Sequence, residues 1–245
     1  MEKYSNNQDT TLSLERQEEI KDCLAHIRQA IKESTAKSPY GQTPRLLLAT
    51  KTRTAEEINF AISQGIDLIG ENRVQELCEK YEKIQKNRVE IHFIGALQTN
   101  KVKYIIDKVD LIHSLDRLSL AKEIDRQAKK IGKKMKVLCE INIGNEQSKS
   151  GIKPEEAESF LKEISQFSNL EVVGLMAIPP ILTDFMTQKQ YFQKIMDLSL
   201  DISAKRIDNI NMSMLSFGMS SDYELAIECG STLVRIGTAA FGKRN

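Results

Sequence analysis

The sequence predicts an α/β protein that folds as a single (β/α)8 barrel of the TIM type, with an extra helix at its N-terminus. Eight short apolar runs alternate with amphipathic stretches along a chain of 245 residues. Parallel strands that are buried on both faces read as such continuous apolar runs, and this length is usual for one eight-stranded barrel. Because no linker or low-complexity segment interrupts the alternation, we expect one barrel domain over residues 12–245.

The expected elements follow from local patterns. Residues 1–11 are polar, and we expect a flexible tail there. A helix is predicted over 14–37, because Leu24, Ile27 and Ile31 recur on one helical face. Later stretches with the same helical spacing separate the apolar runs. Those runs predict strands at 46–50, 66–69, 91–94, 111–113, 137–143, 172–177, 212–217 and 233–236.

An open, doubly wound sheet is the alternative fold. A dinucleotide-binding sheet of that kind usually carries a Gly-x-Gly-x-x-Gly turn after its first strand, and this sequence has none. A P-loop and a His-Glu-x-x-His motif are also absent from the sequence. Eight successive strand and helix units therefore favour the closed barrel.

Composition excludes several classes of function. The 35 Lys and Arg residues balance 34 Asp and Glu residues, for a net charge of +1, so no overall field would attract nucleic acid or an anionic membrane. No apolar stretch reaches the roughly 18 residues of a spanning helix. Cys23, Cys78, Cys139 and Cys229 lack the spacing of a zinc site. We therefore expect reduced thiols, no bound metal and a cytoplasmic location.

Lys51 is the first candidate functional residue. It follows the apolar run 46–49 and precedes Thr54, which opens the helix capping box Thr54-x-x-Glu57. Lys51 is therefore expected on a strand-to-helix loop, where α/β barrels bind ligands. A lysine held there among apolar neighbours tends towards a lowered pKa, and a neutral amine can form a Schiff base. The simpler interpretation is a lysine that only balances a nearby charge.

Small and polar residues follow the last two predicted strands. Residues 216–222 read Ser-Phe-Gly-Met-Ser-Ser-Asp, and residues 235–238 read Arg-Ile-Gly-Thr. Small residues let backbone N–H groups approach a phosphate, and barrels frequently bind phosphate at these two loops. Each segment alone is weak evidence, since Ser-Gly turns are common, but together they favour a phosphate site.

His92 and His113 lie within predicted strands. A single histidine in an apolar run is more often a satisfied core residue than a catalyst, so both are interpreted as structural. No Ser or Asp close in the sequence completes a catalytic triad with them, and no third ligand suggests a metal site.

A lysine after the first strand and a phosphate site after the last two suggest an aldehyde cofactor that carries a phosphate. Pyridoxal 5'-phosphate (PLP) is the cofactor with that chemistry. A sugar-phosphate aldolase with a Schiff-base lysine is the competing interpretation.

Seven motifs occur in order between about residue 14 and residue 243. They are Ala-Thr-Lys-Thr at 49–52, Gly-Glu-Asn at 70–72, His-Phe-Ile-Gly-x-Leu-Gln-x-Asn-Lys at 92–101, Asn-x-x-x-Lys-Ser-Gly at 145–151, Gly-Leu-Met-Ala-Ile at 174–178, Gly-Met-Ser at 218–220 and Val-Arg-Ile-Gly-Thr at 234–238. This set resembles the pyridoxal phosphate homeostasis proteins, the YggS/PROSC-like family, which is related to the N-terminal domain of alanine racemase. Ala-Thr stands where many members have Val-Ser before the lysine, a change of similar size.

The resemblance implies that PLP is held as a Schiff base on Lys51. It also implies that Arg235 faces the pyridine nitrogen, that Gly237 and Thr238 face the phosphate, and that other residues line the cofactor. The full implied set is Lys51, Asn72, Met176, Ser216, Ser220, Arg235, Gly237 and Thr238.

The implied function is intracellular homeostasis of PLP (vitamin B6) and of amino-acid balance, without catalysis. An arginine keeps its proton, so Arg235 would leave the cofactor ring unprotonated and a poor electron sink. Alanine racemase brings a tyrosine base from a second domain, and we expect none here because the sequence stops at Asn245. A slow PLP-dependent amino-acid racemase is the alternative, since it shares every binding residue. PLP-dependent apo-enzymes are the expected partners of a monomeric carrier.

Overall fold

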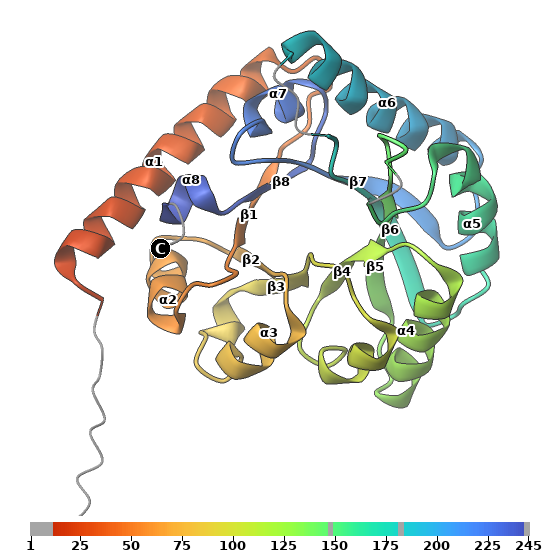
Figure 1. Ribbon diagram of the computed structural model, residues 1–245, viewed down its shortest axis with the longest axis horizontal. Coiled ribbons are helices and arrows are strands. Elements are labelled where there is room, and N and C mark those ends of the chain that lie inside the picture. Colours follow the sequence, from red (N-terminus) through yellow and green to blue (C-terminus); the bar gives the residue numbers. More distant parts are fainter. Residues whose placement is uncertain (1–11, 147–148, 181–183, 243–245) are drawn as a thin grey trace, which may run out of the picture.

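The computed structural model describes residues 12–146, 149–180 and 184–242. Eight parallel strands form a closed barrel in the order β1-β2-β3-β4-β5-β6-β7-β8. The helices surround the barrel (Figure 1). The predicted barrel fold is confirmed, whereas the tail predicted for residues 1–11 lies outside the described residues.

The strands are short, and helices or 3₁₀ turns connect them. The strands are β1 (Arg45–Ala49), β2 (Leu68–Glu71), β3 (Glu90–Phe93), β4 (Leu111–Leu115), β5 (Met135–Ile141), β6 (Leu170–Ala177), β7 (Ile210–Met219) and β8 (Leu233–Ile236). The α-helices are α1 (Leu14–Lys37), α2 (Ala55–Ser63), α3 (Val74–Lys80), α4 (Leu118–Lys130), α5 (Ala157–Ile164), α6 (Phe185–Ala204), α7 (Tyr223–Glu228) and α8 (Thr238–Phe241). The 3₁₀ helices are η1 (Lys86–Arg88), η2 (Thr99–Tyr104) and η3 (Pro154–Glu156).

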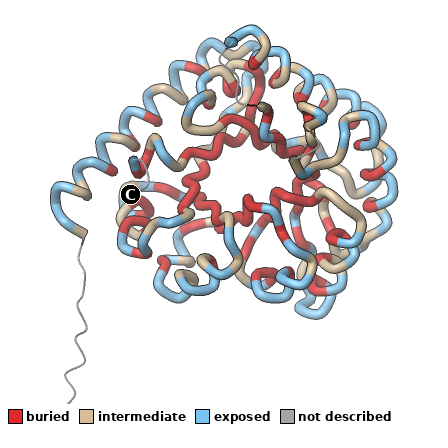
Figure 2. The backbone as a smooth tube through the Cα atoms, in the orientation of Figure 1, coloured by how far each residue is buried: buried red, intermediate tan, exposed pale blue. Residues whose placement is uncertain are grey.

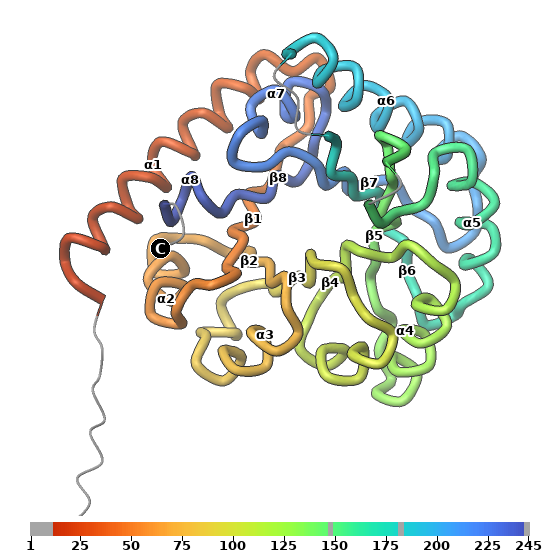
Figure 3. Tube along the Cα trace, viewed as in Figure 1, coloured from red at the N-terminus to blue at the C-terminus, as the bar shows by residue number. Residues whose placement is uncertain are grey.

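Closure of the barrel brings the two ends of the sequence together. Figure 3 shows that the chain runs round the ring in sequence order until β8 lies beside β1. These two strands pair in parallel, with Leu47 opposite Arg235. The loop that follows β1 and the loop that follows β8 therefore lie at the same end of the barrel.

The N-terminal helix α1 has the predicted bounds. The Ser13 hydroxyl accepts from the Arg16 N–H at its start, which is a common N-cap. Its buried residues include Ile20, Leu24 and Ile27. The helix packs on α7 and α8 (Figure 1), so it covers the place where the barrel closes.

Buried residues form a ring at the centre and exposed residues form the rim (Figure 2). Leu48 belongs to the large apolar cluster shared with the helices. Leu47 and Ala49, its neighbours on β1, belong to a separate cluster that also contains Leu68 and Leu233. Because successive side chains of a strand point to opposite faces, this second cluster fills the inside of the barrel.

Several strands differ from the predicted ranges at their ends. β2 begins at Leu68, because the Ile66 N–H still donates to the Ala61 carbonyl. It continues to Glu71, which pairs with Phe93 of β3. β4 continues to Leu115, which places His113 in its middle. β7 extends to Met219, which lies opposite Arg235 of β8 after a shift in register.

Within the described part of the chain, none of the helices is both long and apolar enough to span a bilayer.

Candidate functional site

A pocket of about 580 Å³ opens at the carboxyl end of the barrel. Six of the eight predicted cofactor residues line it: Lys51, Asn72, Ser220, Arg235, Gly237 and Thr238. They come from β8, from just after the ends of β1 and β2, and from the loops that follow β7 and β8. Residues far apart in sequence meet here because the parallel strands all end on this side.

The loop that carries Lys51 is a tight turn. The Thr50 N–H donates to the Gly70 carbonyl, and the Arg53 N–H donates back to the Thr50 carbonyl. Thr52 has a positive φ of 64°, which is uncommon for a residue with a side chain. The Thr54 and Glu57 capping box then begins α2, as predicted. Lys51 is therefore held between a buried strand end and a fixed helix start.

A group of charged side chains holds both neighbours of Lys51. The Thr50 hydroxyl donates to Glu71 Oε1 over 2.8 Å, and the Thr52 N–H donates to Glu76 Oε2 over 2.7 Å. Lys80 Nζ lies 2.9 Å from Glu71 Oε1 and 3.3 Å from Glu76 Oε2. Burial raises the pKa of Glu71, and the positive charge of Lys80 opposes that rise. These contacts fix the backbone on each side of Lys51.

Asn72 is placed by close packing against the next loop. A Cβ added to Gly95 would lie 2.1 Å from the Asn72 carbonyl oxygen, so only glycine fits there. The Asn72 Oδ1 atom is buried and has no hydrogen-bond partner among the described residues. A buried amide oxygen of this kind in a pocket wall needs a donor from a ligand or from water.

The loops after β7 and β8 form a small polar cradle. Gly218 has a φ of +93°, which lets β7 turn into the Ser220 loop. The Ser220 hydroxyl oxygen accepts from the N–H groups of Gly237 and Ala239, both over 3.2 Å. These two N–H groups thus converge on Ser220 Oγ in the pocket wall, beside Thr238. Backbone N–H groups and hydroxyls are the donors that a phosphate uses.

Arg235 is a buried cation in the pocket wall, with 5% of its surface exposed. Its Nη1 donates to the carbonyl and hydroxyl oxygens of Ser216, over 2.7 and 2.6 Å, and its Nη2 donates to the Ala177 carbonyl over 3.1 Å. Burial lowers the pKa of Arg235 to about 10, and the charges of Glu140 and Asp222 oppose that shift. The guanidinium therefore remains charged at neutral pH.

Glu140 is a carboxylate near Arg235, outside the residues that line the pocket, that sequence reasoning missed. Burial raises its pKa to about 7, and nearby Asp116 adds to the rise, while Arg235 and Arg117 oppose it. The signal in the sequence was a single carboxylate within the apolar run of β5. Its closeness to Arg235 depends on the arrangement of β5 relative to β8, which the run itself does not reveal.

Met176 and Ser216 are buried, with 1% and 0% exposure. They lie next to each other in the sheet and are not among the residues that line the pocket. Ser216 contacts the pocket through Arg235. A direct contact of either residue with a cofactor stays a prediction.

The two buried histidines lie against each other. His92 Nδ1 and His113 Nε2 are 2.9 Å apart, and His113 Nδ1 is 3.1 Å from the Ser216 hydroxyl. Ser216 is distant from His113 in sequence but close to it in space, a contact that the sequence does not reveal. Among the described residues, no three His, Cys, Asp or Glu side chains are grouped so as to hold a metal ion.

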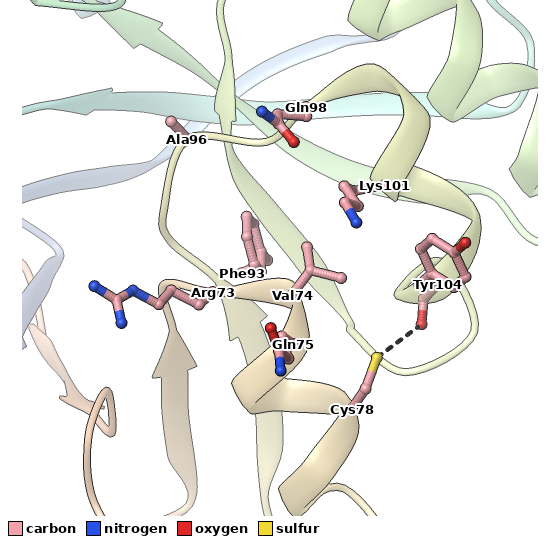
Figure 4. A pocket seen from close by; sticks show the side chains of 9 residues that line it. All are labelled: Arg73, Val74, Gln75, Cys78, Phe93, Ala96, Gln98, Lys101 and Tyr104. Atoms are coloured by element: carbon pink, nitrogen blue, oxygen red, sulfur yellow. Dashed lines mark hydrogen bonds between the residues drawn. The ribbon is translucent and has the colours of Figure 1, made fainter.

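A second pocket, of about 620 Å³, lies beside α3 and η2. Cys78 Sγ donates to the Tyr104 carbonyl over 3.6 Å at its edge (Figure 4). Arg73 points away from Lys101 in Figure 4, so the two cations do not converge on one anion. This pocket offers an exposed lysine without a phosphate-binding loop. It is therefore a useful comparison for the pocket at Lys51.

Known proteins resemble this chain over nearly its whole length. A family model described as "Alanine racemase, N-terminal domain" matches residues 23–245. A pyridoxal phosphate homeostasis protein of Aquifex aeolicus is 42% identical over 222 residues, which cover 90% of this chain and 96% of that relative. The chain belongs to the pyridoxal phosphate homeostasis protein family.

Two solved structures are similar to this family member in fold. PipY of Synechococcus elongatus, solved with PLP bound, is 28% identical with a TM-score of 0.79, and the match covers 91% of this chain and 100% of PipY. An alanine racemase of Clostridium difficile has a TM-score of 0.73 at 15% identity, over 91% of this chain and 60% of the racemase. The second likeness shows a shared barrel fold alone.

The pocket of this family member fits a phosphorylated aldehyde in size and chemistry. Its volume of about 580 Å³ is within the usual range of small-ligand sites. It contains one primary amine at Lys51, a cradle of N–H and O–H donors, and the buried Asn72 Oδ1 that lacks a partner among the described residues. An amine and hydroxyl donors of the kinds that an aldehyde and a phosphate require are therefore present in the pocket wall.

Proposed function

We propose that this protein is a non-enzymatic carrier that binds PLP as a Schiff base on Lys51 and so contributes to PLP homeostasis and amino-acid balance. The observation that supports it most is the meeting of Lys51, Arg235 and the Ser220 to Thr238 cradle in one pocket. When bound, PLP supplies an aldehyde carbon that a primary amine can attack. The PLP found in PipY, a relative over the whole barrel, supports the same assignment.

Different residues of the pocket would bind different parts of the cofactor. Lys51 would supply the amine, and the loop at Gly237 with the Ser220 and Thr238 hydroxyls would bind the phosphate. Arg235 would donate to the ring nitrogen and, because an arginine keeps its proton, would leave that nitrogen unprotonated. An unprotonated ring withdraws electrons weakly from an attached amino acid.

The side chains of the pocket also favour binding over catalysis. Among the described residues that line it, Lys51 is the one group suited to act as a base, since Arg235 keeps its proton and no Tyr, His, Asp or Glu is present. Racemisation removes a proton from one face of Cα and returns one to the other face. A single base therefore suits holding the cofactor better than racemisation.

A slow PLP-dependent amino-acid racemase is the second candidate, because the matching family model is that of the alanine racemase N-terminal domain. It would use the same binding residues. It would also need a second proton donor at the open side of the pocket.

The carrier proposal includes a cytoplasmic location, a monomeric state and PLP-dependent apo-enzymes as partners. The four cysteines are unpaired, which suits a reducing compartment.

Transfer of cofactor tests the carrier role. The PLP-loaded protein is mixed with the apo form of a PLP-dependent enzyme, and recovery of that enzyme's activity is followed against free PLP at the same concentration. We expect recovery, together with loss of PLP from the carrier. A loaded protein that retains its PLP in the presence of excess apo-enzyme contradicts the carrier role.

A further inference from the structure

A chain of polar side chains crosses the inside of the barrel from its amino end to the pocket. Glu90 begins β3, and its Oε1 lies 3.4 Å from His92 Nε2. His92 Nδ1 lies 2.9 Å from His113 Nε2, and His113 Nδ1 lies 3.1 Å from Ser216 Oγ. Ser216 Oγ accepts from Arg235 over 2.6 Å. Four strands, β3, β4, β7 and β8, thus contribute to one continuous path.

The path is buried in a part of the core that other barrels fill with apolar side chains. His92, His113 and Ser216 are fully buried. Barrel interiors are usually built from layers of branched apolar residues, and a buried polar group is costly unless it is hydrogen-bonded. Here both nitrogens of each imidazole have a partner. Such a satisfied network rigidifies the groups that it connects.

The Glu90 end fixes the direction of the hydrogen bonds. The hydrogen bond with His92 and the charge of Arg45 lower the pKa of Glu90 to about 2, so its carboxylate can only accept. His92 Nε2 must therefore donate. Burial lowers the pKa of His92 against the opposing effect of Glu90, which favours the neutral ring. Its Nδ1 then carries no proton and accepts from His113 Nε2.

The same reasoning continues to the pocket. Burial lowers the pKa of His113, with further contributions from His92 and Arg235, so this ring is also neutral. Its Nδ1 accepts the hydroxyl proton of Ser216. Ser216 Oγ then accepts from Arg235, which can only donate. Every proton along the path is thus directed away from the pocket and towards Glu90.

Ser216 and Ala177 bind one side of the Arg235 guanidinium, and its remaining N–H groups are left for the pocket. A guanidinium has five N–H groups, and three of them bind Ser216 and Ala177. The other two have no hydrogen-bond partner among the described residues. Rotation of the guanidinium would break its contact with Ser216 Oγ, so the path, together with the Ser216 and Ala177 carbonyls, fixes where these two donors point.

We propose that His92 and His113 are positioning residues for Arg235, which act through Ser216 in a one-way chain of hydrogen bonds that ends at Glu90. The direction of the chain is a property of the protein without cofactor. Its effect on PLP rests on the function proposed above, in which Arg235 faces the ring nitrogen. The two parts are therefore tested separately.

The direction of the chain is tested by nitrogen NMR of the histidine rings in the protein without cofactor. His92 and His113 are expected as neutral rings with the proton on Nε2, and exposed His26 on α1 is the reference signal. A proton on Nδ1 of either buried ring, or a charged ring at neutral pH, overturns the chain. This result does not depend on whether PLP binds.

The positioning role is tested with His113→Phe and with Ser216→Ala, a smaller change that breaks the same link. Ser114→Ala is the matched control, because Ser114 is the buried neighbour of His113 on β4 and its hydroxyl has no partner among the described residues. Affinity is measured for PLP and for its 1-deaza analogue, in which carbon replaces the ring nitrogen. Both chain variants should lose about tenfold in affinity for PLP, as expected for a hydrogen bond to a charged group, and little for the analogue.

Equal losses for the two ligands in a folded Ser216→Ala protein overturn the positioning role. So does a loss of the same size in Ser114→Ala. If Arg235→Ala itself binds PLP as tightly as the wild type, the assignment of Arg235 in the proposed function is wrong, and the positioning role falls with it. The NMR result on the direction of the chain stands in that case.

Discussion

Lys51 depends on residues both near it and far from it in the sequence. The strand end and the Thr54 capping box were visible in the sequence because they involve residues within a few positions of Lys51. The contacts of Thr50 with Glu71 and of Thr52 with Glu76 come from the next strand and helix. No local pattern predicts them. The position of the lysine could thus be predicted, but the charged residues that support it could not.

The partners of the polar residues inside the barrel could not be predicted from the sequence either. Glu140 and the pair of histidines looked like isolated polar residues within apolar runs. Their partners lie on other strands, and β7 and β8 come near β4 and β5 only across the inside of the closed barrel. By contrast, the small residues of the two C-terminal loops were visible in the sequence, and these loops meet at the pocket. Phosphate binding there stays a prediction.

Glu140 should make stability depend on pH. Its pKa is raised from 4.5 to about 7 in the folded protein. Its contribution to the free energy of unfolding is therefore fully present below pH 4.5 and is lost as the pH rises through 7. At about 1.4 kcal/mol for each pH unit, the loss is on the order of 3 kcal/mol. Urea unfolding of Glu140→Gln should show a smaller fall in the free energy of unfolding between pH 5 and pH 8 than the wild type shows.

Exposed Glu155→Gln is the matched control for this experiment, and it should follow the wild type at both pH values. If Glu140→Gln and the wild type fall equally between pH 5 and pH 8, Glu140 titrates normally and the raised pKa is wrong.

Thr238→Ala should weaken the binding of PLP by roughly tenfold or more, because a hydrogen bond to a charged group contributes on the order of 1.5 to 3 kcal/mol. Pyridoxal, which lacks the phosphate, should bind weakly to the wild type and be indifferent to the substitution. Calorimetric titration of both ligands measures the difference. Equal losses for the two would indicate general damage to the fold rather than a lost phosphate contact.

At the scale of single elements, strand number and order were more predictable than strand ends. β8 has the predicted bounds and α1 has them as well, because apolar spacing and a helix cap define them locally. β2 and β7 end two residues later than predicted. Their ends are set by pairing with neighbouring strands, which places Glu71 and Met219 inside the sheet. Pairing is a long-range property that the sequence pattern of one strand does not contain.

The cap of α2 offers a prediction at this scale. Thr54→Ala removes the hydroxyl that accepts from the Glu57 N–H and should lower the free energy of unfolding by about 1 kcal/mol. Thr54→Ser keeps a capping hydroxyl and should stay close to the wild type. Urea unfolding of the two variants compares them directly. Equal stability of both variants would mean that the cap contributes nothing measurable.

At the scale of the whole molecule, closure of the parallel barrel brings the site residues together. A closed parallel barrel places the ends of all eight strands on one side, so Lys51 from the start of the chain meets Arg235 and Thr238 from its end. The same topology leaves the amino side for Glu90 and Arg45, which form an ion pair over 2.7 Å. Both the pocket and the buried chain that leads to it follow from barrel closure.

A carrier should not interconvert amino-acid enantiomers. In deuterated water with single L-amino acids, the PLP-loaded protein should form no product enantiomer above the level of free PLP, because the described pocket offers one base. Chiral chromatography and proton NMR follow the reaction. Racemisation near the ~1 to 10³ s⁻¹ usual for enzymes, abolished by Lys51→Ala, would contradict the non-catalytic role and support the racemase alternative.

Borohydride reduction of the PLP-loaded protein, followed by peptide mass spectrometry, tests the central claim most directly. We expect the loaded protein to be yellow and the reduced cofactor to be attached to the peptide that contains Lys51. Lys101→Ala, which removes the exposed lysine of the neighbouring pocket, should be labelled like the wild type, whereas Lys51→Ala should lose the label. A label on another lysine in the wild type, or no label after incubation with excess PLP, would contradict the account.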